Sequence, residues 1–500
     1  MTVAMNDLSR IRPATRAFLG ADHQNFIDGQ WCPPVRERLL HKLCAEDPGG
    51  YGLGQLPQHH RCSTALRRLQ GIGLGPGERR RRCKGLYRNT NRRTFSVAEL
   101  TWVPGAFKIT PVSPAAQVDY DPLMAAGIFT AHSELLDTTD AIAEVARELP
   151  LDSAEFVLLL HGPNHTGDAL ENALSLNAGE RFYGCSTSGE IVPQGYRENT
   201  LSAISFDRSS FSCVSRKIDN VKEFGFQHAR DLVLSMQWEL RENKPDSNSS
   251  NTFALLLIDS MSQAEEIVVA ALGNELGTIH LVGGSSGDNW QIERTPVIYQ
   301  GQLQDDSAVV LLVHTTLDFR HYNFHNFIPS DKRGVITSAT PAKRLVHEIN
   351  GVVAVKEYAR LCSIDENTLD QEILAMHPAI ITVGDRAYPR GFMQILPDGS
   401  MQSACAIDEG VVFRVPTQLD YVEQLRQAFR RMHQELGENL MVLGFECAAR
   451  KQLVQQYHLE QEVFAQFTAC NVWGFSCMGE QSNSLNMNNS FNCLAFRLPS

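Results

Sequence analysis

The sequence predicts an α/β fold, built from internally repeated strand–helix–strand–turn–strand units that form two pseudo-symmetric halves. Glycine turns at residues 184–190 and 474–480 share Gly, Ser, Gly and Glu at one constant offset, and a looser copy lies at 283–288. Apolar runs and helical spacing recur in the same order around each turn. Internal self-similarity of this kind indicates a chain that was built from duplicated units.

Length and composition exclude several classes of protein. A chain of 500 residues is too long for one hydrophobic core, so two or three domains are expected. The formal net charge of −12 disfavours nucleic acid as the main partner. The sequence has neither an apolar run long enough for a membrane span nor the apolar core of a secretory signal. Its twelve cysteines include no C-x-x-C pair, so we expect buried thiols, Cys447 among them, in a reducing cytoplasm.

Residues 1–118 differ in character from the rest of the chain. Arginines cluster at 67–68 and 79–82, and glycine and proline interrupt every periodic run. One interpretation is a basic arm that binds an acidic partner. The other, which we favour, is a poorly organised or disordered extension. The folded part is therefore expected to consist of residues 119–318 and 319–500.

The predicted elements follow the same order in each unit. An apolar run predicts a buried strand, apolar residues at helical spacing follow, and a second strand leads into the glycine turn and an alternating return strand. The first unit has strands at 155–160, 181–183 and 201–206 and a helix at 167–178. The second has strands at 253–258, 279–282 and 307–313 and a helix at 263–276. The third has strands at 440–445, 472–473 and 491–496 and a helix within 450–469.

The segment between the second and third units has its own pattern. Residues 318–333, rich in aromatic side chains and histidine, are predicted to be a linker between the halves, and a helix is predicted at 354–362. Residues 378–416 are predicted to form short strands. The sequence Pro397-Asp398-Gly399 indicates a hairpin turn there, because Asp-Gly tolerates the positive φ angles that tight turns need.

The glycine turns are candidate ligand sites. Glycine permits positive φ and close backbone approach, and such a turn can direct N–H groups and hydroxyls toward an anion or a small polar ligand. The alternative is a tight turn in which Ser and Glu cap the local backbone. The candidate ligand-binding residues are Gly184, Ser186, Gly189, Glu190, Gly283, Ser285, Gly474, Ser476, Gly479 and Glu480.

Enzymatic motifs are weak. Gly283-x-Ser285-x-Gly287 has the form of a hydrolase nucleophile elbow, but a loop-like sequence follows it where the elbow requires a helix. No Gly-Lys-Ser/Thr triplet closes a phosphate-binding loop. His161 and His165 do not have the spacing of a catalytic metal motif. We therefore predict no enzymatic activity, and a hydrolase remains the enzymatic alternative.

The three turns, together with the closing Asn488-Asn489-Ser490, resemble the FIST domain. This resemblance implies an N-terminal and a C-terminal half and a cytoplasmic sensory module for small ligands. Asn486 stands where the family often has a histidine. A narrower resemblance to the NosP-type FIST proteins is carried by residues 326–329, 335–337, 344–351, 356–360, 398–401 and 405–410.

The narrower resemblance implies a haem-based nitric oxide sensor that regulates a histidine kinase or a cyclic-di-GMP enzyme. The alternative is a FIST module that binds a small polar metabolite, such as an amino acid, at the glycine turns. Haem needs a proximal imidazole in an apolar pocket. His321 and His325 lie four residues apart among aromatic side chains, His314 follows an apolar strand, and His347 precedes a glutamate that could orient its ring. For each histidine, an ordinary surface or core role is the alternative.

Overall fold

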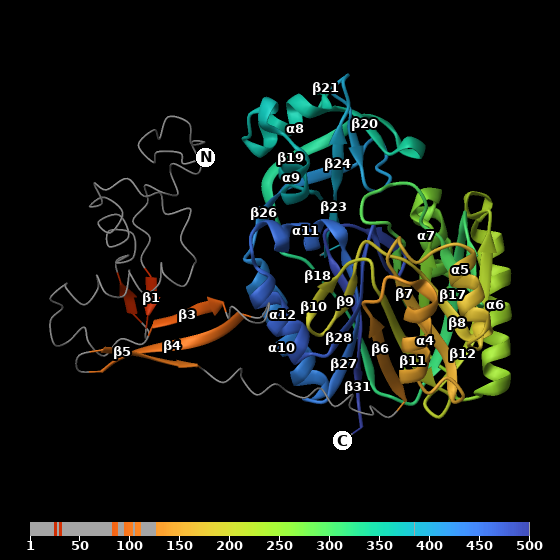
Figure 1. Ribbon diagram of the computed structural model, residues 1–500. Coiled ribbons are helices and arrows are strands. Elements are labelled where there is room, and N and C mark those ends of the chain that lie inside the picture. Colours follow the sequence, from red (N-terminus) through yellow and green to blue (C-terminus); the bar gives the residue numbers. More distant parts are fainter. Residues whose placement is uncertain are drawn as a thin grey trace. The chain divides into compact units, whose positions relative to one another are not determined.

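The computed structural model describes residues 127–384 and 386–499, together with the backbone of five short strands nearer the N-terminus (Figure 1). These strands are β1 (Asn25–Ile27), β2 (Gln30–Cys32), β3 (Cys83–Arg88), β4 (Phe95–Val103) and β5 (Ala106–Pro111). Strand β1 pairs with β2, and β3, β4 and β5 form an antiparallel sheet. Apart from these strands, the predicted extension at 1–118 lies outside the described residues. The chain divides into two compact units, Met1–Asp121 and Pro122–Ser500, and the second carries the fold described below.

Three copies of one unit form the main body of Pro122–Ser500. The first contains β6 (Ile128–Ser133), α4 (Thr138–Glu148), β7 (Ala154–His161), α5 (Asp168–Ser175), β8 (Phe182–Ser186), β9 (Glu190–Val192), β10 (Gly195–Arg197) and β11 (Leu201–Asp207). The second contains β12 (Phe211–Asp219), α6 (Phe226–Asn243), β13 (Thr252–Ile258), α7 (Glu265–Leu276), β14 (His280–Ser285), β15 (Val297–Tyr299), β16 (Gln302–Gln304) and β17 (Ser307–Thr315). The third contains β18 (Phe319–Phe324), α10 (Tyr421–Leu436), β27 (Leu440–Cys447), α11 (Ala448–Gln456), α12 (Glu460–Ala469), β28 (Val472–Cys477), β29 (Glu480–Ser482), β30 (Leu485–Met487) and β31 (Phe491–Arg497). The predicted α/β fold with repeated units is confirmed.

The three units exchange their hairpins in a closed cycle. Hairpin β9–β10 of the first unit completes the sheet of the third, in the order β10-β9-β28-β27-β31-β18. Hairpin β15–β16 of the second completes the sheet of the first, and β29–β30 of the third completes the sheet of the second. The topology therefore has cyclic three-fold symmetry, and each six-stranded sheet needs strands from two units.

The register of the sheets explains the first glycine of each turn. In every unit two central strands are parallel, namely β7 and β8, β13 and β14, and β27 and β28. A glycine on the second strand of each pair faces a backbone carbonyl of the first. The facing pairs are Gly184 with Leu159, Gly283 with Leu256, and Gly474 with Gly444. A Cβ atom at any of these glycines would collide with the facing carbonyl oxygen. Glycine therefore recurs at this position because two strands approach each other too closely for a side chain.

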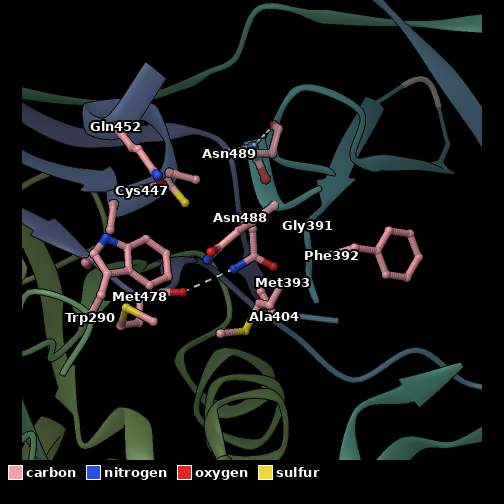
Figure 2. Close-up of a pocket in the computed structure, with 15 residues that line it drawn as sticks. Trp290, Gly391, Phe392, Met393, Ala404, Cys447, Gln452, Met478, Asn488 and Asn489 are labelled. Carbon is pink, nitrogen blue, oxygen red and sulfur yellow. Dashed lines mark hydrogen bonds between the residues drawn. The ribbon is translucent and has the colours of Figure 1, made fainter. Parts of the chain in front are cut away.

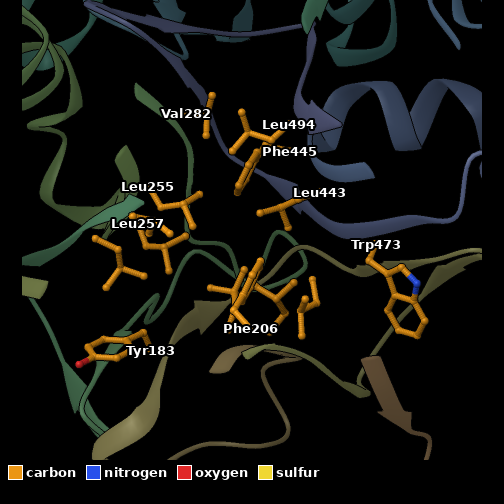
Figure 3. Packing of buried hydrophobic residues seen from close by; sticks show 14 of the residues in the cluster. Tyr183, Phe206, Leu255, Leu257, Val282, Leu443, Phe445, Trp473 and Leu494 are labelled. Atoms are coloured by element: carbon orange, nitrogen blue, oxygen red, sulfur yellow. The ribbon is translucent and has the colours of Figure 1, made fainter. Parts of the chain in front are cut away.

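The inner faces of the three sheets meet in one hydrophobic core (Figure 3). Phe211 of the second unit packs edge-to-face against Phe206 of the first and Phe496 of the third, with ring centroids 5.1 and 6.1 Å apart. Helices cover the outer faces: α4 and α5 on the first sheet, α6 and α7 on the second, and α10 and α12 on the third. Among the described residues, no helix is both long and apolar enough to cross a bilayer.

An insertion with its own core interrupts the third unit between β18 and α10, and is drawn in teal at the top of Figure 1. It contains β19 (Phe327–Thr340), β20 (Leu345–Ile349), β21 (Val352–Val353), α8 (Ala354–Cys362), α9 (Gln371–Met376), β22 (Ala379–Val383), β23 (Arg386–Arg390), β24 (Phe392–Ile395), β25 (Met401–Ser403) and β26 (Val412–Gln418). The helix predicted at 354–362 and the short strands within 378–416 are present.

Two details differ from the sequence-based expectation. Residues 318–333, predicted to be a linker, contain β18 and the first half of β19, and the aromatic side chains of β18 are buried on both faces of its sheet, Phe319 in the central core and Tyr322 under the helices. The helix predicted within 450–469 is two helices, α11 and α12. His458 between them has a φ of +54°, which no α-helix accommodates.

Candidate functional site

The three glycine turns meet and are hydrogen-bonded to one another. The Ser188 amide donates to the Ser476 carbonyl at 2.9 Å, and the Ser476 amide donates to the Gly189 carbonyl at 2.8 Å. These two bonds join the first and third turns. The Ser285 amide donates to the Gly479 carbonyl at 2.8 Å and joins the second turn to the third.

A further pair of bonds joins the second turn to the first. The Gly287 amide donates to the Ser186 carbonyl at 3.0 Å, and the Ser186 amide donates to the Pro296 carbonyl at 3.0 Å. These amides are therefore engaged within the protein and do not form an open nest for an anion. Within the described part of the chain, the buried hydroxyls of Ser186 and Ser476 have no hydrogen-bond partner.

The recurring glutamate holds the start of the return strand. Glu190 accepts hydrogen bonds from the hydroxyls of Thr187 and Thr200, both at 2.5 Å. Glu480 accepts from the Ser490 hydroxyl at 2.7 Å and from the Ser490 amide at 3.0 Å. Burial raises the pKa of Glu190 to about 7 and that of Glu480 to about 8. Both glutamates therefore serve the local backbone, which is the alternative role that the sequence left open for them.

The other recurring residues also have local backbone roles. Asn199 and Asn489, which precede Thr200 and Ser490, have φ angles of +57° and +56°, a region that asparagine tolerates better than most residues. Gly189 has a φ of +121°. Gly479 is restricted differently, because an added Cβ would lie 2.9 Å from the Asn486 side-chain oxygen.

A pocket opens beside the third turn, between the third unit and the insertion (Figure 2). Its empty volume is about 460 Å³, including space that is open to solvent. Trp290 contributes from the loop after β14, Met478 from the third turn, and Met393 from the insertion. The remaining wall includes Asn488 and the first residues of α11.

Two polar groups of the pocket are the amino end of α11 and the amide of Asn488, and the side chains of Gln371, Gln452 and Asn489 also line it. Ala448 and Ala449, the first two residues of α11, line the pocket, and the side chain of the N-cap residue Cys447 makes no capping hydrogen bond. The side chain of Asn488 is buried, and its nitrogen donates to the Met478 carbonyl at 3.3 Å. Its oxygen has no partner among the described residues. The pocket thus combines a helix terminus that attracts negative charge with an acceptor that lacks a donor.

None of the ten predicted glycine-turn residues lines this pocket, although Cys477 and Met478 of the third turn do. Sequence reasoning did not identify Trp290 or Gln452 as pocket residues. Asn488 belongs to the closing motif that resembles the FIST domain, but the motif did not indicate that its side chain lines a pocket. The ligand-binding role of the glycine turns stays a prediction.

The four candidate haem histidines lie in or directly after the strands β17, β18 and β20. His314 is in β17, with its Nε2 3.7 Å from an Asp246 carboxylate oxygen. His321 is in β18, and its Nε2 lies 2.7 Å from the Asn492 side-chain oxygen. His325 follows β18, and its Nε2 bonds to the Ala387 carbonyl at 2.9 Å.

His347, in β20, has both ring nitrogens engaged by hydroxyls, those of Thr340 and Ser400, at 2.9 Å each. None of the four histidines lines the pocket. Burial lowers the pKa of His321 to about 4, so its ring is neutral, but its Nε2 is already engaged. In this arrangement the residues do not fit a haem site.

The insertion is tied to α7 by a buried cluster of charged groups. Arg344 of the insertion donates to the carboxylate of Glu265 and, at 3.0 Å, to that of Glu266. The Ala406 amide also donates to Glu266, at 2.9 Å. Asn486, in β30, donates to Glu266 at 3.1 Å. The insertion, helix α7 of the second unit and the hairpin β29–β30 therefore meet in one polar cluster beside the pocket, which we call the Arg344 junction.

Comparison with known proteins identifies similar sequences. The family model for the FIST N domain matches residues 155–352, and the one for the FIST C domain matches residues 354–483. An uncharacterised protein of Methanocaldococcus jannaschii is 26% identical over 189 residues, which cover 37% of this chain and 35% of the relative. The chain thus spans about a third of the length of that relative.

Proposed function

This chain belongs to the FIST-domain family, and on that basis we propose that it senses a small ligand, which binds in the pocket beside α11. FIST domains are associated with small-ligand sensing in signal transduction and not with catalysis. The observation that supports this pocket most is the unpartnered oxygen of the buried Asn488 side chain. An unpaired buried acceptor costs about 1–3 kcal/mol, and a ligand that donates to it recovers that cost.

The ligand class follows from the two polar groups. The amino end of α11 favours an anionic group such as a carboxylate. The Asn488 oxygen accepts from a hydroxyl or an ammonium group. Trp290, Met393 and Met478 supply apolar contact for the rest of the molecule. A small polar metabolite with a carboxylate and a neighbouring donor, such as an amino acid, satisfies these requirements.

Signal transmission would use the position of the pocket between two bodies. A ligand that contacts both the insertion and α11 favours the arrangement in which they are close, by the difference in its affinity for the two arrangements. The Arg344 junction would carry the change to α7. The partner that we propose, a histidine kinase or a cyclic-di-GMP enzyme, rests on the sequence resemblance alone.

The test is a thermal-shift screen of the purified full chain against the twenty amino acids and inorganic phosphate, followed by calorimetry on the best compound. Asn488→Ala is expected to weaken binding about tenfold, which corresponds to about 1.4 kcal/mol. The control is Asn492→Ala, another buried asparagine that lies outside the pocket. Equal affinities for the two variants would contradict the assignment of the pocket.

The haem-based nitric oxide sensor is tested separately, by the absorption spectrum of the full chain after incubation with haemin. Because the four histidines do not fit haem, we expect no stoichiometric Soret band. A Soret band that disappears in His321→Ala or His325→Ala would overturn our choice and support haem ligation at that histidine.

A further inference from the structure

The internal repeat identifies an unusual residue in the third turn. The third residue after the first glycine is Thr187 in the first unit, Ser286 in the second and Cys477 in the third. The Thr187 hydroxyl donates to Glu190 at 2.5 Å, and the Ser286 hydroxyl donates to the Ile258 carbonyl at 3.1 Å. Two units thus use a hydroxyl here as a hydrogen-bond donor.

The Cys477 thiol makes the corresponding contacts more weakly. Its sulfur lies 3.3 Å from the Glu446 carbonyl and 3.7 Å from the Glu480 carboxyl oxygen. A thiol is a weaker donor than a hydroxyl. Hydrogen bonding therefore does not account for a cysteine at this position.

A second thiol faces Cys477. Cys447 is its register partner across the parallel strands β27 and β28, so both side chains leave the same face of the sheet. Neighbouring strands are about 4.8 Å apart, and disulfides join residues whose Cα atoms are about 4.4–6.8 Å apart. Both cysteines are free and both line the pocket. The third unit therefore presents two thiols, at disulfide spacing, to the space that we assign to the ligand.

We propose that Cys447 and Cys477 form a redox-active dithiol, which a hydroperoxide that enters the pocket oxidises to a disulfide. Cys447 is the first to react, because it is the more exposed of the two thiols.

The reaction balances with hydrogen peroxide alone. The Cys447 sulfur attacks one peroxide oxygen, the O–O bond breaks, and a sulfenic acid and one water form. The Cys477 sulfur then attacks the sulfenic sulfur, and a second water leaves with the remaining thiol proton. The two sulfurs lose two electrons, and the peroxide is reduced to two waters.

Two consequences follow from the surroundings. Burial and the Glu480 carboxyl raise the pKa of both thiols, so little thiolate is present at neutral pH and oxidation is slow. The disulfide would tie the N-cap of α11 to the third turn inside the pocket wall. An effect of the disulfide on ligand affinity rests on the proposed function, whereas the formation of the disulfide does not.

The test is mass mapping of the full chain after treatment with hydrogen peroxide, alkylation and digestion with trypsin and chymotrypsin without reductant. We expect a Cys447–Cys477 cross-linked peptide, loss of alkylation at both residues, and reversal by dithiothreitol. The folding-competent test variant is Cys477→Thr, because threonine occupies the equivalent position in the first unit. It is expected to lose the cross-link, and the control Cys493→Ser is expected to retain it.

Several results would overturn the proposal. One is that both thiols are alkylated after peroxide treatment to the same extent as in the untreated protein. Another is a cross-link from Cys477 to the nearby Cys185. A third is that Cys447 gives the same oxidation product in Cys477→Thr as in the wild type. Trp290 lines the same pocket and gives a second readout. The emission difference between wild type and Trp290→Phe is expected to shift on oxidation, and a constant difference would show that the pocket does not respond. Neither measurement needs a ligand, so a negative ligand screen leaves both interpretable.

Discussion

At the scale of single residues, the glycine turns combine close backbone approach with buried carboxyl groups. Gly184 and Gly283 are needed because a neighbouring strand occupies the space of a Cβ atom. Glu190 and Glu480 fasten the return strands from inside the protein. Sequence recurrence indicated these residues, but not that the turn amides would bond to one another, since that depends on how three distant segments meet.

Substitution of Gly283 by alanine is expected to destabilise the protein by about 3 kcal/mol or more, because the new methyl group collides with the Leu256 carbonyl. The control is Gly225→Ala, where no atom lies within 4 Å of the added Cβ and φ is −146°. Urea unfolding monitored by circular dichroism measures both. Equal midpoints would show that the strands separate without cost.

The pKa of Glu480 predicts a fall in stability as the pH rises through neutrality. Because this pKa is raised to about 8, the folded state binds the proton more tightly than the unfolded state. The resulting stability is fully present below the ordinary pKa of glutamic acid and is lost as the pH rises through about 8. His161, whose pKa burial lowers to about 4, has the opposite effect, but only below about 6.5. Stability is therefore expected to fall between about pH 6.5 and 8.

Glu480→Gln is expected to flatten this fall, since an amide does not titrate. The matched control is Glu438→Gln, whose side chain is 93% exposed. Thermal melts at half-unit pH intervals give the comparison. A slope as steep in Glu480→Gln as in wild type would show that another group titrates.

At the scale of elements, the insertion is held to α7 through Arg344. Its partners Glu265 and Glu266 belong to the first turn of that helix, where carboxylates are favourable. The sequence predicted the short strands and helix of the insertion, because their apolar patterns are local. It did not predict the Arg344 junction or the hairpin exchange, because a three-residue strand carries no information about which sheet it joins.

Removal of the Arg344 side chain is expected to cost about 3–5 kcal/mol, because the buried Glu265 carboxylate and the partly exposed Glu266 carboxylate lose their cation. Glu265→Gln added to Arg344→Ala is expected to restore part of that loss. The exposed pair Arg294–Asp305 provides a control, and Arg294→Ala is expected to cost less than about 1 kcal/mol. A double variant no more stable than Arg344→Ala would mean that charge is not the source of the loss.

At the scale of the whole molecule, the closed exchange of hairpins makes the three units interdependent. Each sheet needs strands from two units, and all three sheets share one core. The sequence predicted the repeats and the α/β class from periodicity. Helices α4, α6 and α10, each of which precedes the first predicted strand of its unit, were not predicted. The pocket was not predicted because it forms between segments that are distant in the chain.

Unfolding of the three units is therefore expected to be a single cooperative transition. Trp238 in α6 and Trp473 in β28 report on the second and third units. In variants that retain one of these two tryptophans, the urea midpoint from tryptophan fluorescence is expected to equal the midpoint from circular dichroism. A separate early transition at either tryptophan would show that its unit unfolds alone.

The central claim is that a small ligand binds between α11, Asn488 and the insertion. A crystal structure with the compound that gives the largest thermal shift tests it most directly. We expect density for an anionic group at the amides of Ala448 and Ala449, and a donor within hydrogen-bond distance of the Asn488 oxygen. Density for the compound at the junction of the glycine turns, with this pocket empty, would contradict the account.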